Sequence, residues 1–183
     1  MTSNIKITKE KDILFLKSIA NTGLITNNLI SSYNINKKRL KQHIKSENII
    51  EAKDLIIYGN NVSIYFLSGK SKADIRRKYG LGIYKTNKQQ LEHDYVLAKI
   101  YSKLSYDEQN RWINETKLKT FYKDTEITDG FYISDSGLKI GVEVITNRYT
   151  KESIEGKKDF IKNNCDDYIM IHADKLIEYN IAI

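Results

Sequence analysis

Apolar residues recur at helical spacing near the start of the chain. Leu16, Ile19 and Ala20 lie on one side of a helix, which the sequence predicts to end at Gly23. A short second helix is predicted over residues 27–33. Both elements carry apolar residues on which a core can form.

A third, more basic helix is predicted from Asn36 or Lys37 to about Glu47. Leu40 and Ile44 stand four positions apart, so they bury one side of this helix. The other sides carry polar and basic residues: Lys37, Lys38, Arg39, Lys41, Gln42 and Lys45. Such a helix presents positive charge over most of its surface.

Two β-rich runs flank residues 59–61, and the sequence Gly-Asn-Asn between them predicts a hairpin. Three helices followed by a hairpin are typical of a winged helix-turn-helix, whose third helix enters the major groove of DNA. The candidates for base reading are Asn36, Arg39 and Gln42. The candidates for backbone contact are Lys37, Lys38, Lys41 and Lys45, with Asn60 and Asn61 on the wing. A protein-interaction module that never touches DNA is the alternative.

The second half of the chain predicts helices and strands in a mixed order. An apolar helix is expected from residue 87 onward, after a domain boundary at Gly80, so the domains are residues 1–80 and 81–183. The remaining elements are strands near Glu115–Tyr122, 130–134 and 138–146, a helix from Lys151 to Asn163 and a strand at Asp167–Ile171. This order matches the restriction-endonuclease-like core of the PD-(D/E)xK nucleases, so the expected fold class is α+β.

Two acids stand where such cores hold Mg²⁺. Asp129 precedes the second strand and Glu143 lies in the third, and carboxylate oxygens are the hard ligands that Mg²⁺ prefers. Glu92, on the preceding helix, is the candidate for a third ligand. The alternative is an ordinary hairpin that carries two acids on its solvent-exposed face.

The lysine that nuclease cores carry two residues after the strand acid is missing, because Ile145 stands there. Lys139 lies four positions before Glu143 and faces the same side of the strand, so it is the candidate catalytic substitute. Lys157 or Lys158 could reach in from the following helix. The motif is incomplete, and a nuclease-like fold without cleavage is the favoured interpretation.

Composition adds a basic first half. Residues 1–80 carry 15 Lys and Arg against 6 Asp and Glu, whereas residues 81–183 carry 15 against 17. This asymmetry favours a polyanionic partner for the first half, with a lysine-rich solvated surface as the alternative. Cys165 is the single cysteine, which excludes an internal disulfide, and no Cys/His cluster indicates zinc. Without an apolar run long enough for a membrane span, the sequence predicts a soluble cytoplasmic protein.

Several short motifs are spread along both halves of the chain, namely Arg39-Leu40, Tyr65-Phe66-Leu67-Ser68-Gly69-Lys70, Leu91-Glu92-His93-Asp94, Arg111-Trp112-Ile113-Asn114-Glu115, Thr128-Asp129-Gly130 and Val142-Glu143-Val144. Together they resemble the replication-relaxation (MobC-like) proteins of plasmids and integrative elements. The resemblance implies a DNA-binding protein of replication or conjugative transfer, with relaxase or replication proteins as partners. It also implies a nuclease-like second domain. In that family the lysine after the strand acid tends to be absent, which agrees with Ile145 at that position here.

Three functional hypotheses follow. The first is sequence-specific binding of double-stranded DNA in plasmid replication or mobilisation. The second is a Mg²⁺-dependent endonuclease that the winged helix directs to its site. The third is a transcription regulator whose second half only dimerises, which gives a homodimer, or senses a partner.

Overall fold

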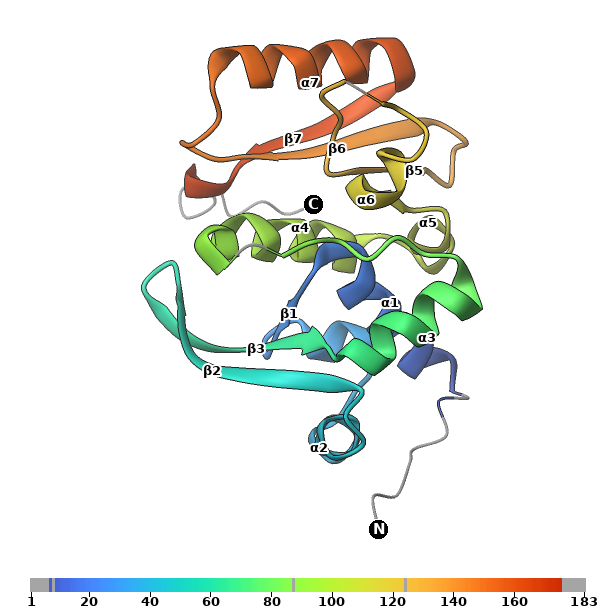
Figure 1. The fold of residues 1–183 in the computed structure, drawn as a ribbon, viewed down its shortest axis with the longest axis vertical. Helices are drawn as coiled ribbons and strands as arrows, with labels where there is room; N and C mark the ends of the chain where they lie inside the picture. Colours follow the sequence, from blue (N-terminus) through green and yellow to red (C-terminus); the bar gives the residue numbers. More distant parts are fainter. Residues whose placement is uncertain (1–6, 8, 87, 124, 176–183) are drawn as a thin grey trace. The chain divides into compact units, whose positions relative to one another are not determined.

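The computed structural model describes residues 7, 9–86, 88–123 and 125–175. The chain divides into two compact units, Met1–Ser102 and Lys103–Ile183, which are called the first and second unit below. Seven α-helices and two sheets lie within the described residues (Figure 1). The predicted α+β class is confirmed at this level.

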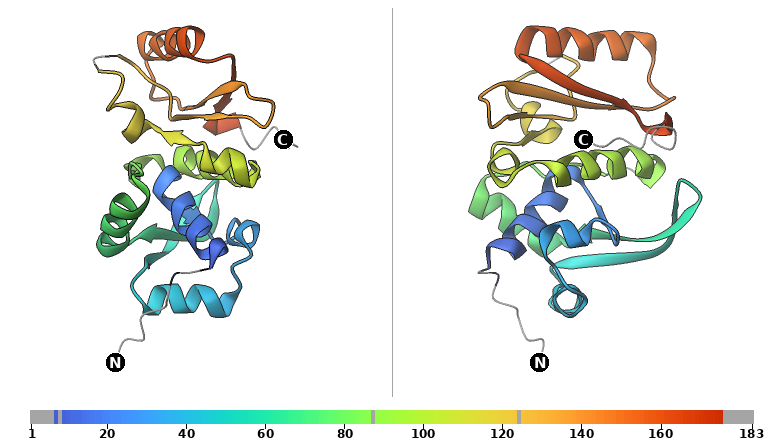
Figure 2. Two further views of the ribbon diagram at one scale, coloured as in Figure 1. Left: turned by 90° about the vertical axis from the view of Figure 1, so that its right-hand side faces the viewer. Right: turned by 180° about the vertical axis from the view of Figure 1, so that it is seen from behind.

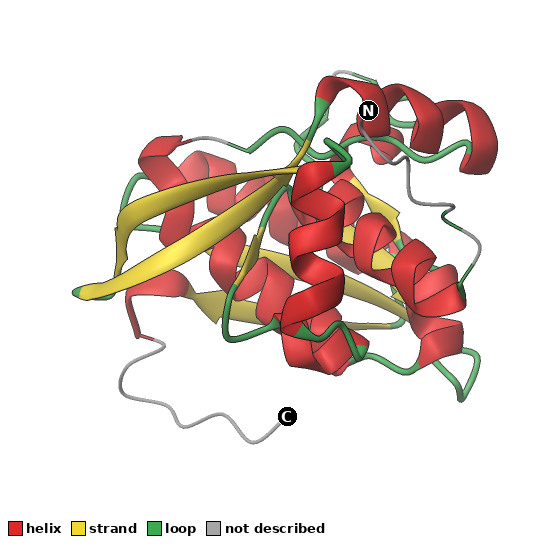
Figure 3. Cartoon of the chain, turned by 90° about the horizontal axis from the view of Figure 1, so that it is seen from below, coloured by secondary structure: helices red, strands yellow, loops and turns green. Residues whose placement is uncertain are grey.

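The first unit surrounds a three-stranded sheet. Its elements are α1 (Glu10–Thr22), β1 (Ile25–Thr26), η1 (Ile30–Tyr33), α2 (Lys37–Lys45), β2 (Ile49–Ile57), β3 (Asn60–Leu67), α3 (Gly69–Tyr79), η2 (Lys88–Gln90) and α4 (Leu91–Lys103). The strand order is β1-β3-β2, and both pairings are antiparallel. β2 and β3 form the predicted hairpin, visible as a long two-stranded ribbon in Figure 3. Its turn is made by Tyr58 and Gly59, both with positive φ.

Local sequence explains where the first helices end and begin. The Gly23 N–H donates to the Ile19 carbonyl, and Gly23 has a φ of 87°, so α1 stops at the predicted residue. The Asn36 side chain accepts a hydrogen bond from the Arg39 N–H at 2.9 Å, which caps the start of α2. The short helix expected over residues 27–33 is a 3-10 turn confined to η1.

The core of the first unit extends past the expected domain boundary at Gly80. Leu91 and Ala98 of α4 are buried in the same apolar cluster as Phe15 of α1. Tyr101 is fully buried, and its hydroxyl accepts a hydrogen bond from Asn21 of α1 at 3.1 Å. The first unit therefore includes α4 and ends after Ser102.

The second unit is built on a four-stranded mixed sheet. Its elements are α5 (Tyr106–Asn110), β4 (Ile113–Asn114), α6 (Glu115–Leu118), β5 (Gly130–Ile133), β6 (Lys139–Ile145), α7 (Lys151–Asn164), β7 (Asp167–His172) and η3 (Ala173–Lys175). The strand order is β4-β5-β6-β7, with β6 and β7 parallel and joined through α7. Figure 2 shows α7 running alongside β6 and β7.

The strand expected at Glu115–Tyr122 was wrong. Only Ile113 and Asn114 pair with β5, and the chain then turns into the short helix α6. The Asn114 side chain accepts a hydrogen bond from the Lys117 N–H at 3.0 Å, a helix cap that competes with continued extension. The strands expected at 130–134 and 138–146, the helix after Lys151 and the strand after Asp167 are all present.

No helix among the described residues is long and apolar enough to cross a membrane.

Candidate functional site

The lysines of α2 form an exposed cationic surface. Lys37, Lys38, Lys41 and Lys45 are all exposed, and α2 contains no acidic residue. Residues three and four positions apart on a helix are neighbours, so these lysines start from adjacent positions along one side of α2. We call these four residues the α2 lysine surface.

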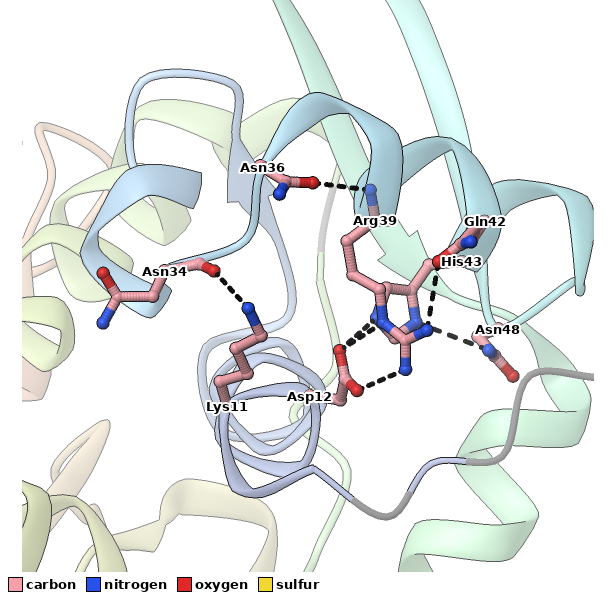
Figure 4. Close-up of polar contacts among 8 residues, drawn as sticks. All are labelled: Lys11, Asp12, Asn34, Asn36, Arg39, Gln42, His43 and Asn48. Atoms are coloured by element: carbon pink, nitrogen blue, oxygen red, sulfur yellow. Dashed lines mark hydrogen bonds and ion pairs between the residues drawn. The ribbon is translucent and has the colours of Figure 1, made fainter.

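Arg39 points away from that surface and into the first unit. Its Nε donates to the Asp12 Oδ1 at 2.8 Å, and its Nη2 pairs with the Asp12 Oδ2 (Figure 4). Its Nη1 donates to the Gln42 Oε1 at 3.0 Å. The Asp12 side chain is fully buried and that of Arg39 is only 16% exposed. Arg39 therefore joins α2 to α1 through a forked ion pair.

His43 completes this buried cluster. Its Nε2 lies 3.0 Å from the Asp12 Oδ1, and its Nδ1 lies 3.4 Å from the Asn48 Nδ2. Burial lowers the pKa of His43 more than the neighbouring Asp12 raises it, so the imidazole is neutral near pH 7. Its Nε2–H then donates to Asp12, while Nδ1 accepts from Asn48.

Asp12 keeps its charge despite its burial. Burial raises the pKa of Asp12, but the hydrogen bonds from Arg39 and His43 outweigh that effect and hold the pKa below its ordinary value. The carboxylate and the Arg39 guanidinium thus form a buried ion pair with a neutral histidine beside them. Burial of an ion pair is tolerated only when both ions are well satisfied by partners, as they are here.

The remaining amides expected to contact DNA also have internal partners. Asn36 caps α2 through its Oδ1. The Asn60 Nδ2 donates to the Tyr58 carbonyl at 3.0 Å, and the Asn61 Nδ2 lies 3.4 Å from the Asp54 Oδ1. Of the residues expected to contact DNA, the structure leaves the α2 lysine surface turned to solvent and gives Asn36, Arg39, Gln42, Asn60 and Asn61 internal contacts.

In the second unit, Asp129 and Glu143 lie together. β5 and β6 are antiparallel neighbours with Gly130 opposite Val142, which brings Asp129 beside Glu143. The Asp129 N–H donates to the Glu143 Oε2 at 3.1 Å, and the Val144 N–H donates to the Asp129 Oδ2 at 2.8 Å. Asp129 is 3% exposed and Glu143 is fully buried, so neither carboxylate lies on the wet face of a hairpin.

Lys157 of α7 is the lysine that the structure places at these acids. Its Nζ lies 2.9 Å from the Glu143 Oε1 and donates to the Ile127 carbonyl at 2.9 Å. Burial lowers the pKa of Lys157, but the charges of Glu143 and Asp129 outweigh burial and raise the pKa above its ordinary value. The site thus contains a buried ion pair between the carboxylate of Glu143 and the charged ammonium group of Lys157.

The other expected lysines lie elsewhere. Lys139 begins β6, about 13 Å along the strand from Glu143, and its Nζ lies 5.4 Å from the centre of the Phe131 ring. Lys158 is exposed and pairs with Glu155 at 2.7 Å. Neither contact places an ammonium group at the acids, which leaves that position to Lys157.

Both acids of the expected Mg²⁺ site have internal partners. Lys157 pairs with Glu143 at 2.9 Å, and a backbone N–H group bonds to each carboxylate. Within the ranges that the structure describes, no three His, Cys, Asp or Glu side chains are grouped as metal ligands. Glu92 belongs to α4 of the first unit, so its role as a third ligand stays a prediction.

Comparison with known proteins adds no relative: no family model matches the chain, and neither a curated protein nor a solved structure matches it.

Proposed function

We propose that the first unit binds duplex DNA through the α2 lysine surface. The observation that carries the proposal is the exposure of Lys37, Lys38, Lys41 and Lys45 on a nine-residue helix without an acid. Duplex DNA carries one negative charge per about 1.7 Å of its axis, so such a helix would neutralise several phosphates and release their counterions.

The order of elements in the first unit supports this proposal. A helix, a short strand, a 3-10 turn, a basic helix and a hairpin follow one another, and the short strand pairs with the second strand of the hairpin. In a winged helix-turn-helix this order presents the basic helix to the major groove and the hairpin to the backbone. α3 adds further exposed cations, namely Lys70, Lys72, Arg76, Arg77 and Lys78.

The second unit is proposed to be a nuclease-like domain that does not cut DNA. Its mixed sheet with a helix between parallel strands agrees with that core, but both acids are buried and Glu143 is paired with Lys157. Hydrolysis needs a water and a phosphate within reach of the carboxylates. The ion pair instead joins α7 to β6 in the interior of the second unit.

The biological setting is proposed from the resemblance alone. It is plasmid replication or conjugative mobilisation, with relaxase or replication proteins as the protein partners. A regulator of transcription is the competing setting. The two settings differ in where the bound DNA lies, at a promoter or at a replication or transfer origin.

The test is binding of a fluorescent 30-base-pair duplex at about 0.1 M salt, followed by anisotropy. Replacement of Lys38, Lys41 and Lys45 by Ala should weaken binding by about tenfold or more, because each lost phosphate contact removes counterion release. The matched control replaces Lys151, Lys158 and Lys162 of α7, which are also exposed, and removes the same charge. Equal affinities for the two variants would contradict the proposal.

A further inference from the structure

Arg39 is the residue of α2 best suited to read a base, and it is occupied inside the protein. Guanine is read by two N–H groups of one arginine directed at its O6 and N7 atoms. In Arg39, Nε and Nη2 are bonded to Asp12, and Nη1 is bonded to Gln42 (Figure 4). None of the three nitrogens is left without an internal partner.

The two amides on the same helix are occupied at their oxygens. An Asn or Gln reads adenine by accepting from N6 with its oxygen while its NH₂ donates to N7. The Asn36 Oδ1 accepts the Arg39 N–H at 2.9 Å, and the Gln42 Oε1 accepts the Arg39 Nη1 at 3.0 Å. Both amide oxygens are therefore used to start α2 and to hold Arg39.

Releasing Arg39 toward DNA would be unfavourable. Asp12 is fully buried, and without Arg39 its carboxylate would lose the main partner that keeps it charged. His43 is neutral and fully buried, so it offers neither a replacement charge nor a base contact. We therefore expect Asp12, Arg39 and His43 to keep these contacts when the protein binds DNA.

We propose that the DNA contact discriminates weakly between base sequences, an inference that rests on the proposed function. The side chains that α2 turns to solvent are chiefly lysines, each a mobile point charge on a flexible stem. Phosphate contacts fix position and affinity but carry no sequence information. The ligand is therefore duplex DNA as a polyanion rather than one preferred sequence, which disfavours both the regulator setting and sequence-specific binding in replication or mobilisation.

The test is selection of the full-length chain on a randomised 30-base-pair duplex library at about 0.1 M salt, with sequencing of the bound fraction. Specific DNA-binding proteins prefer their sites by about 10³-fold or more. We expect no sequence to bind more than about tenfold tighter than the unselected pool. A shared motif bound at the 10³-fold level would overturn the inference but leave the proposed function standing. Failure to bind any duplex would overturn both.

Gln42→Ala gives a second test that keeps Asp12 and Arg39 in place. Gln42 is half-buried and its replacement removes one hydrogen bond to Arg39. If the proposal holds, this variant selects from the library as broadly as the wild type. A change in base preference at one position, with the fold retained, would show that Gln42 or the partly released Arg39 reads a base and would overturn the inference.

Discussion

Asp12 stands on the buried side of α1, three and four positions before Phe15 and Leu16. A charged residue on an apolar stripe requires a partner inside the protein. Arg39 and His43 are the partners of Asp12. The two are four positions apart on α2, on the same side as the packed Leu40 and Ile44. This pairing could have been predicted from the buried sides of α1 and α2 considered together. The basic character of α2 alone led to the prediction that Arg39 contacts DNA.

Removing Asp12 should strongly destabilise the first unit. We expect Asp12→Ala to lower the free energy of unfolding by about 3–5 kcal/mol, because Arg39 is left largely buried without its counter-charge. The matched control is Asp74→Ala, since Asp74 forms an ion pair with Arg77 on the surface of α3. That control should change stability by about 1 kcal/mol or less. Denaturant unfolding of both variants measures the difference, and similar losses would show that the buried ion pair contributes no more to stability than the surface pair.

His43 should make stability depend on pH. Its pKa is lowered by burial in the folded state, so the unfolded chain binds a proton first as the pH falls below about 6.5. The stabilisation from neutral His43 is complete above that pH and is lost as the pH falls toward the folded-state pKa. We expect the wild type to lose up to about 1.4 kcal/mol per pH unit over that window. His43→Gln should lose less between pH 7.5 and 5.5, and an identical loss in both proteins would contradict the assignment.

At the scale of elements, apolar spacing and turn residues predicted α1, α2, the β2–β3 hairpin, β5, β6 and α7. These signals are local, so they predict helices and strands without knowledge of the fold. The strand at Glu115–Tyr122 failed because the Asn114 cap turned the chain into α6. The pairing of Lys157 with Glu143 depends on how α7 packs on β6, so the sequence could offer Lys157 only as one of several lysines.

The contacts of α4 define the smallest stable first unit. A fragment of residues 1–102 should unfold cooperatively, because it keeps Leu91 and Ala98 in the core and the hydrogen bond from Asn21 to Tyr101. A fragment of residues 1–80 loses those groups and should be less stable by several kcal/mol, on the order of a large-to-small core substitution. Urea unfolding of the two fragments decides the matter. Equal stability would place the boundary at Gly80 and remove α4 from the core.

The burial of Asp129 and Glu143 and the pairing of Glu143 with Lys157 predict that the second unit does not cleave DNA. Supercoiled plasmid incubated with the wild type and Mg²⁺ or Mn²⁺ should remain supercoiled, because Asp129 and Glu143 are buried and bonded internally. The comparison is Glu143→Ala under the same conditions. Robust cutting by the wild type that this substitution abolishes would restore the nuclease hypothesis and give Lys157 a catalytic role.

At the scale of the whole molecule, charge is unevenly divided along the chain. The first 80 residues hold 15 Lys and Arg against 6 Asp and Glu, and the rest of the chain is slightly acidic. Affinity for DNA should therefore come from the first unit and fall steeply with salt, since counterion release dominates a contact made by lysines. The acid pair and the Asp12 cluster stabilise their own units. Neither involves the α2 lysine surface, whose charge stays exposed to solvent.

The salt dependence of duplex binding tests the central claim most directly. The slope of log K against log salt concentration should become shallower by about 2–3 when Lys38, Lys41 and Lys45 are replaced by Ala, since each phosphate contact contributes about 0.9. The variant without Lys151, Lys158 and Lys162 should keep the wild-type slope. If the α2 variant retains both the affinity and the slope of the wild type, the α2 lysine surface is not the DNA contact.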